Sequence, residues 1–266
     1  MKIQSTPLRS EALGTFGIAI RPTLLFVAAF ALNVTPHEAA HAVAAYLLGF
    51  SSTLFQMWVN PDAETASSRQ VVAIATAGPI FSLAVGGIAW LLYKFRYNHN
   101  PAGLVFLMLA VVGIYSFLGP VTGAAFGGDF NVALKSIGAS KIIQNATSAT
   151  GLVLLPLFMF FMGKELSRWA PLSFGCAKAV VCTTGAPWLI GTLLILLVYW
   201  PLPRFLIGPT LIGSSFWLFA VFGAAYGFSR RRTANLATSV TRSDLIITVF
   251  ALIMVRMLVH GVRLAH

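Results

Sequence analysis

Long apolar stretches, separated by short polar loops, dominate this sequence. They cover roughly residues 22–49, 71–93, 101–119, 150–163, 179–200, 205–228 and 245–262. A helix that crosses a bilayer needs about 20 mostly apolar residues, and only the fourth stretch is clearly shorter. Charged residues make up 9% of the chain, against roughly 25% in a soluble domain, which is too few to cover a water-exposed surface. The sequence therefore predicts an all-α polytopic membrane protein, an integral multi-pass chain with about 6–7 transmembrane helices.

The basic residues are spread over the loops between these stretches. The net charge is +11, and residues such as Lys94, Arg96 and Arg230 lie in short loops. This distribution is typical of membrane topology signals and of contact with anionic lipid headgroups. We therefore expect the lipid bilayer, and not a nucleic acid, to be the partner of this charge. More lysines and arginines fall on the side of the N-terminus than on the other side, which favours a cytoplasmic N-terminus.

The first apolar stretch contains the motif His37-Glu38-Ala39-Ala40-His41. On a helix, residues four apart share one face, so both imidazoles can meet one Zn²⁺ ion. Glu38 lies beside them and can take a proton from water that the metal activates. Charged groups inside a bilayer cost at least roughly 2.5–3.5 kcal/mol each, so these polar residues need a compensating partner, which a cation supplies.

A helix cap is a simpler interpretation of Glu38. Thr35, Pro36 and Glu38 fit the N-cap, N1 and N3 positions of a capping box. A helix that starts at Thr35 would account for the glutamate as a capping side chain. It would not account for the two histidines.

A catalytic zinc site needs a third protein ligand and leaves a fourth position open. The other histidines, His99, His260 and His266, lie in a polar turn or near the chain end, where we expect them at the membrane interface. Asp129 is the best acidic candidate, because it follows two glycines within a largely apolar segment. It could instead be the N-cap of a short helix over residues 130–137.

Glu165 is the competing acidic ligand. Lys164 and Arg168 surround it in the sequence, which suggests a salt bridge in a loop. We therefore expect Glu165 to be paired with a cation rather than with a metal ion.

Three segments together resemble a known family, the site-2 proteases, or M50-type intramembrane zinc metalloproteases. The His37–His41 motif matches the family's HExxH in a membrane helix. The segment Gly78-Pro79-Ile80-Phe81-Ser82 is similar to the Gly-Pro segment of its next helix, and Gly127-Gly128-Asp129 to its aspartate motif. The resemblance covers roughly residues 22–140. Here the glycines precede the aspartate, and Ser82 stands where the family often has asparagine.

The resemblance implies a fold and a division of the chain. A site-2-protease-like three-helix catalytic core would surround a buried zinc ion, and residues 50–60 would form a short membrane-associated β-element that holds an extended substrate by strand addition. The expected parts are an N-terminal interfacial segment 1–21, a catalytic membrane core 22–140, and additional transmembrane helices 141–266 of unknown role. The family's usual orientation places the N-terminus outside, opposite to the charge distribution.

The resemblance also implies an activity. One Zn²⁺ per chain would be held by His37, His41 and Asp129, and Glu38 would act as general base in hydrolysing a transmembrane segment of another protein. Asn33, Ser82 and Asn131 are further candidates to contact a ligand residue or the substrate. We expect the chain in a cytoplasmic membrane, most simply a bacterial one.

Other functions fit parts of the sequence. A membrane transporter or scaffold could carry a degenerate, inactive metal site. A CAAX-type membrane zinc protease would use Glu165 in place of Asp129. A di-iron desaturase shares the HxxxH spacing, but such sites need many more than the five histidines present here.

Overall fold

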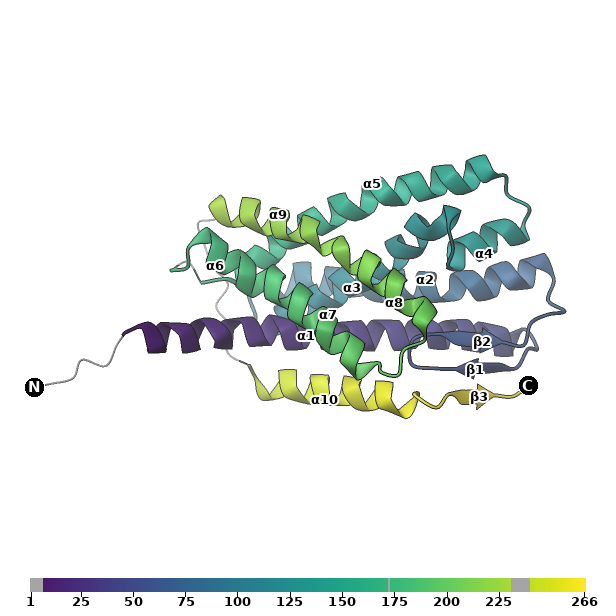
Figure 1. Cartoon of the computed structure of the whole chain (residues 1–266), viewed down its shortest axis with the longest axis horizontal. Coiled ribbons are helices and arrows are strands. Elements are labelled where there is room, and N and C mark those ends of the chain that lie inside the picture. The colour runs from purple at the N-terminus through teal and green to yellow at the C-terminus, as the bar shows by residue number, and fades with distance from the viewer. Residues whose placement is uncertain (1–6, 172, 231–239) are drawn as a thin grey trace, which may run out of the picture.

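The computed structural model describes residues 7–171, 173–230 and 240–266, without the side chains of residues 7–17, 205 and 209. Helices form an elongated bundle around the long helix α1 (Pro7–Leu47), and a small sheet lies at the end of the bundle opposite to the N-terminus (Figure 1). Residues 1–6 of the predicted interfacial segment lie outside the described residues, and residues 7–21 are the first turns of α1.

The remaining helices follow α1 in order along the chain. They are α2 (Ser68–Leu92), extended by a π-helical segment (Tyr93–Tyr97), α3 (Gly103–Thr122), α4 (Asp129–Ser136), α5 (Lys141–Leu166), α6 (Cys176–Val180), a π-helical segment (Val181–Gly185), α7 (Ala186–Val198), α8 (Arg204–Ser215), α9 (Trp217–Ser229) and α10 (Arg242–Met257). Within the described residues, six helical segments are long and apolar enough to cross a membrane. The predicted helical, membrane-spanning class is confirmed at this level.

The predicted fourth stretch is longer than expected. α5 begins at Lys141 instead of near residue 150, and its length then suits a membrane crossing. Its first turns carry polar side chains that bond inside the protein: Gln144 donates to Ala139 O, and Ser148 donates to Thr122 O. The partner of Gln144 lies in the turn just before α5, and that of Ser148 lies at the end of α3. The apolar pattern alone does not reveal this polar part of the helix.

The predicted end of the last apolar stretch, at residue 262, is wrong. α10 stops at Met257, and Val262 begins strand β3 (Val262–Leu264). Gly261 has a φ of +77°, a backbone conformation that glycine adopts without strain. The chain turns there and pairs with a strand from another part of the sequence.

The small sheet joins the segment between α1 and α2 to residues near the C-terminus. β1 (Ser52–Leu54) lies between β2 (Val59–Pro61) and β3, and both pairings are antiparallel. Ser52 is opposite Pro61 on one side and Leu264 on the other. The β-element expected over residues 50–60 is therefore present, and β3 is an addition that the sequence did not predict.

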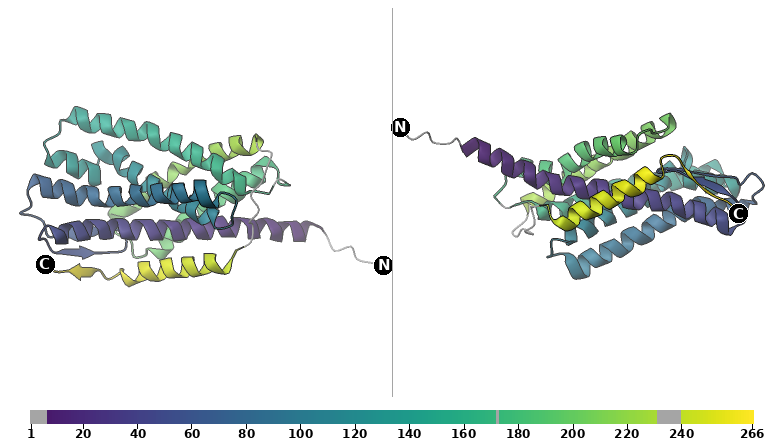
Figure 2. Two further views of the ribbon diagram at one scale, coloured as in Figure 1. Left: turned by 180° about the vertical axis from the view of Figure 1, so that it is seen from behind. Right: turned by 90° about the horizontal axis from the view of Figure 1, so that it is seen from below.

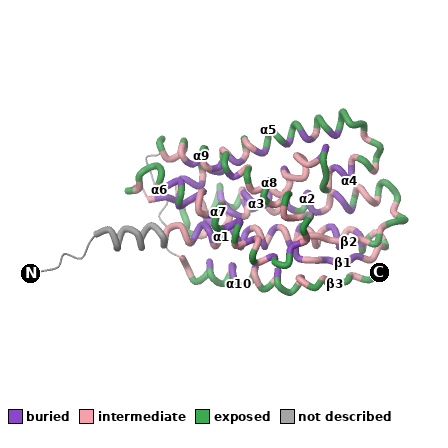
Figure 3. The backbone as a smooth tube through the Cα atoms, viewed as in Figure 1, coloured by how far each residue is buried: buried purple, intermediate pink, exposed green. Residues whose placement is uncertain are grey.

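The core lies where α1 and α3 meet the other helices. Buried residues gather at the centre of the bundle and in strand β1, whereas the outward face of α5 is largely exposed (Figure 3). Exposed large apolar side chains such as Ile142, Val153 and Leu197 cover the outside. Lipid, unlike water, accommodates such a surface at no hydrophobic cost.

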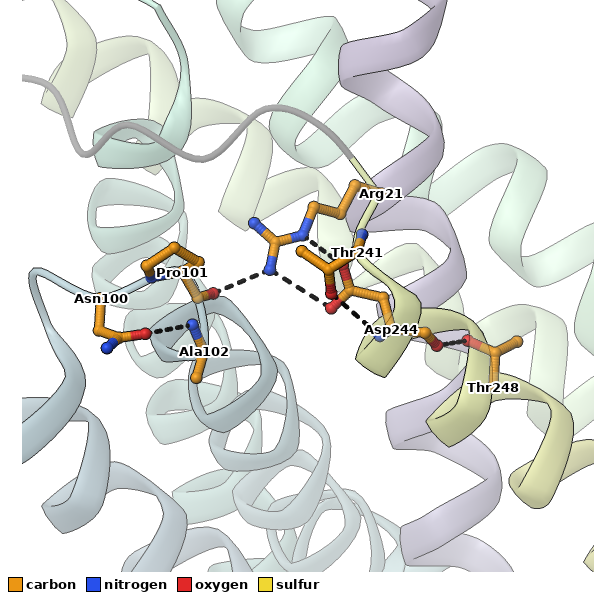
Figure 4. A network of polar contacts seen from close by, with 7 residues as sticks. All are labelled: Arg21, Asn100, Pro101, Ala102, Thr241, Asp244 and Thr248. Carbon is orange, nitrogen blue, oxygen red and sulfur yellow. Dashed lines mark hydrogen bonds and ion pairs between the residues drawn. The ribbon is translucent and has the colours of Figure 1, made fainter.

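A buried ion pair fixes α10 against α1. Arg21 and Asp244 are each 1% exposed, with 2.8 Å between Nε and Oδ2, and Arg21 Nη2 also donates to Pro101 O at 2.9 Å. Thr241 and Asp244 form a capping box at the start of α10. Figure 4 shows this network, and Figure 2 shows α10 alongside α1 in two further views.

Asp244→Ala is expected to destabilise the fold strongly. Removing one partner of a buried ion pair typically costs about 3–5 kcal/mol. The expected result is a clearly lower unfolding midpoint of the purified protein in detergent. Asp62→Ala, which breaks an exposed pair with Arg263, is the control and should cost about 1 kcal/mol or less. Equal midpoints for the two variants would contradict a fixing role for Arg21 and Asp244.

Candidate metal centre

Helix α1 supplies the two histidines from its interior. It runs without interruption from Pro7 to Leu47, so no helix begins at Thr35. The Thr35 hydroxyl instead donates to Gln56 O at 3.1 Å. The cap interpretation of Glu38 is therefore wrong, and the HExxH spacing places His37 and His41 one turn apart on a buried face, 7% and 4% exposed.

The two imidazoles and Asp129 form a group that could hold a metal ion. His37 Nε2 and His41 Nε2 are 3.2 Å apart. Asp129 Oδ2 is 3.4 Å from His37 Nε2, and Asp129 Oδ1 is 3.7 Å from His41 Nε2. Two ligands at the corners of a zinc tetrahedron are roughly 3.3 Å apart, given Zn–N and Zn–O distances of about 2.0–2.1 Å. The two nitrogens and the nearest carboxylate oxygen to each of them are spaced close to this value, with Oδ2 of Asp129 facing His37 and Oδ1 facing His41.

Hydrogen bonds on the far side of each ring leave the Nε2 atoms free. His41 Nδ1 lies 2.6 Å from Ile74 O, a carbonyl that can only accept, so Nδ1 carries the proton. His37 Nδ1 lies 2.9 Å from Ser82 Oγ, a hydroxyl that accepts from Asn33 Nδ2 at 3.1 Å and can either accept from His37 Nδ1 or donate to it. The Nε2 lone pair of His41 therefore faces the carboxylate of Asp129, and that of His37 does so when His37 Nδ1 donates to Ser82. Such outer hydrogen bonds orient metal-binding histidines, and a cation removes the repulsion between the lone pairs.

Asp129 reaches the histidines from the first residue of α4. The N-cap position belongs to Gly128, whose φ of +89° favours glycine, so Asp129 is not the cap itself. Asn131, buried, donates to Ala124 O at 2.7 Å and ties α4 to the end of α3. Burial raises the pKa of Asp129, but where no metal is bound, hydrogen bonds from protonated His37 and His41 and their positive charge outweigh burial and lower the pKa below its ordinary value. The carboxylate is therefore available as an anionic ligand.

Gly78 brings the backbone of α2 against the two histidines. A Cβ atom at Gly78 would lie 2.6 Å from His37 Nε2 and closer still to His41 Nε2. The helix thus passes directly against the space between the two ring nitrogens. The sequence shows only a glycine before Pro79 inside an apolar helix, and this pattern does not reveal which side chains the glycine contacts.

Gly78→Ala is expected to empty the metal site. The added methyl group would occupy the position where the Nε2 lone pairs converge, and we expect zinc affinity to fall by at least about tenfold, the lower end for disturbed ligand surroundings. Gly87→Ala is a matched control in the same helix, because no atom of the described residues lies within 4 Å of its Cβ position. Zinc per chain in the purified variants is the measurement. Equal zinc content in both would contradict this placement.

Glu38 lies next to the metal-binding group at the junction of two cavities. The first, here the inner cavity, has a volume of about 320 Å³ and extends between α1, α3, α7 and α8. The second, here the sheet-side cavity, has about 480 Å³ and extends toward β2 and the start of α2. Glu38 and Asp129 line both cavities. A molecule that occupied both would therefore pass Glu38 and the metal-binding group.

Gln56 fixes the turn between β1 and β2 near this junction. Its side chain is buried, and its Nε2 donates to Tyr199 O at 3.2 Å. Its backbone carbonyl accepts from the Thr35 hydroxyl. The next residue, Met57, lines both cavities. No sequence pattern indicates these contacts, because both partners of Gln56 lie far from it along the chain.

Glu165 lies in a different cluster. Its carboxylate pairs with Arg168 at 3.0 Å and Lys94 at 3.6 Å, and accepts from the Tyr93 hydroxyl at 3.1 Å. Among the described residues, the histidines and acids close enough to share a metal ion are His37, His41 and Asp129. The expected pairing of Glu165 with a cation is present, but Glu165 lies in the last turn of α5 rather than in a loop, and its partners are Arg168 and Lys94.

Comparisons of this chain with protein-family models, curated proteins and solved structures give no match.

Proposed function

We propose that this chain is an intramembrane zinc metalloprotease of the site-2 type, which hydrolyses peptide bonds within or near transmembrane segments of other proteins. The observation that carries the proposal is the convergence of His37, His41 and Asp129 beside Glu38, at the junction of two cavities inside a bundle of apolar helices. A cleavage site of this kind needs a metal, a base and space for a peptide on both sides.

His37, His41 and Asp129 would hold the metal through two nitrogens and one carboxylate. Zinc bound there would polarise a peptide carbonyl and lower the pKa of water. The same ligand types also suit Fe(II), so metal analysis of the purified protein identifies the ion. Glu38 favours hydrolysis, because a carboxylate beside the ligands can accept a proton from water and deliver it to the departing amine.

The sheet offers a place for an extended substrate. β1 is paired on both sides, whereas β2 is an edge strand, and Val59 and Pro61 of β2 line the sheet-side cavity. A peptide added to this edge would replace the hydrogen bonds of its own helix with bonds to the strand. Inside a membrane such replacement matters, because unpaired backbone groups cost several kcal/mol each.

Reconstitution tests the proposal directly. The purified chain is placed in lipid vesicles with designed single-span peptides, and the products are identified by mass spectrometry. We expect cleavage within or beside the apolar segment, loss of cleavage with a zinc chelator, and recovery when zinc is added back. Zinc-loaded protein that cleaves none of the peptides would support an inactive scaffold or transporter instead.

A further inference from the structure

The inner cavity follows one face of α1 away from the metal-binding group. His37, Val34, Phe30 and Phe26 line it in steps of three or four residues. From His37 to Phe26 the helix rises by about 17 Å, at 1.5 Å per residue. The cavity thus leads from Glu38 toward the N-terminal half of α1, whereas the sheet-side cavity leads toward the sheet. The two cavities lie on opposite sides of Glu38 and the metal-binding group, here together called the reacting centre.

The two cavities differ in the surfaces that they offer to a peptide. The sheet-side cavity includes backbone of an edge strand. The inner cavity is walled mainly by apolar side chains, and its polar members away from the metal-binding group are hydroxyls, at Tyr115, Ser116, Thr192, Thr210 and Ser214. Its volume, about 320 Å³, is at the lower end of the range of ligand pockets, roughly 300–1,000 Å³. It suits a few apolar side chains rather than a whole helix.

Helices outside the predicted catalytic core build much of this cavity. Thr192 and Ile195 come from α7, Leu206 and Thr210 from α8, and Trp217 from α9. Phe26 and Trp217 also pack edge to face, with ring centroids 4.8 Å apart. The C-terminal helices α7, α8 and α9 therefore form part of the wall of the cavity beside the reacting centre.

We propose that the inner cavity is a specificity subsite, which binds a large apolar side chain of the substrate on one side of the bond to be cleaved. This proposal rests on the proposed protease function. The substrate on the other side of the cleaved bond lies along β2 in the sheet-side cavity. The substrate backbone passes from one cavity to the other at Glu38. Met57 and Leu206, which line both cavities, flank this passage. The substrate class is then an apolar segment that carries a leucine- or phenylalanine-sized residue next to the cleaved bond.

Filling the cavity should change the preference of the enzyme. Thr192 is 8% exposed and lines the cavity from α7, so Thr192→Leu reduces its volume. One added or missing methylene in an apolar pocket changes discrimination by roughly 10-fold to 200-fold. Thr150→Leu is the matched control, because Thr150 is exposed on α5 and lines neither cavity.

The experiment uses a pool of designed single-span peptides that differ at one position each, with cleaved bonds mapped by mass spectrometry. The wild type and Thr150→Leu should favour leucine or phenylalanine on one constant side of the cleaved bond. Thr192→Leu should shift that preference toward alanine or glycine by about tenfold or more, with zinc content unchanged. An unchanged preference in Thr192→Leu overturns the proposal. Absence of any cleavage by the zinc-loaded wild type overturns the protease function itself.

A second measurement does not depend on turnover. Peptides with a photoreactive leucine analogue beside the cleaved bond are bound to the Glu38→Gln variant and crosslinked, and the attachment sites are mapped. Crosslinks to Thr192, Tyr115 or neighbouring residues of the inner cavity are expected. Crosslinks confined to the residues of the sheet-side cavity overturn the assignment of the inner cavity as the specificity subsite. This measurement decides the question even if Thr192→Leu is inactive.

Discussion

Glu38→Gln is expected to abolish peptide hydrolysis while the purified variant keeps its metal. Glutamine has nearly the same shape as glutamate but cannot accept the proton of the attacking water. General-base catalysis typically contributes about 10²–10⁴-fold to the rate, so cleavage of a single-span peptide in vesicles should fall by at least about a hundredfold. Zinc content should stay unchanged, because the metal-binding group consists of His37, His41 and Asp129.

The control for this experiment is Glu64→Gln. Glu64 is exposed in the loop before α2 and lines neither cavity, so its variant should cleave at the wild-type rate. Undiminished cleavage by Glu38→Gln would contradict the hydrolytic mechanism and leave Glu38 with a structural role.

Asp129→Ala is expected to remove the metal. The variant keeps only two imidazole ligands, one fewer than the three that catalytic zinc sites use. Zinc per chain should drop to a small fraction of the wild-type value, and cleavage should be lost with it. Elemental analysis of protein purified without chelators is the measurement.

Glu165→Ala provides the matching comparison. It removes a carboxylate that pairs with Arg168 and Lys94, so thermal stability should fall moderately while zinc is retained. The reverse outcome, a zinc-free Glu165→Ala with a zinc-loaded Asp129→Ala, would favour a CAAX-type protease and contradict the metal centre described here.

Most of the architecture is readable from the sequence because it depends on local patterns. Apolar length predicts membrane helices, and the spacing of His37 and His41 predicts a shared helical face wherever a helix forms. Asp129 is indicated by a less direct signal, an acid in apolar surroundings. This prediction does not depend on knowing that Asp129 contacts the two histidines. It depends only on the expectation that a charged group in apolar surroundings has a partner.

The features that the sequence does not predict depend on contacts between distant residues. The role of Gly78 arises only when α2 lies against the two ring nitrogens of α1. Strand β3 exists because residues near the C-terminus pair with β1, as Leu264 does with Ser52. The turn that carries Gln56 is fixed by Tyr199 O, far along the chain. Neither hydrophobic periodicity nor a short motif reports such pairings.

The division of the three candidate metal ligands between α1 and α4 has a consequence for biogenesis. Ribosomes add about 5–20 residues per second, and Asp129 follows His41 by roughly 90 residues, so α1 is made several seconds before its third ligand. During this interval α2 can already supply Ile74 O and Ser82 Oγ to the imidazoles. The group of three, however, can form only after α3 has been made and α4 packs against α2, which brings Asp129 to the two imidazoles. A nascent chain therefore lacks the complete group of His37, His41 and Asp129 until the first half of the bundle has assembled.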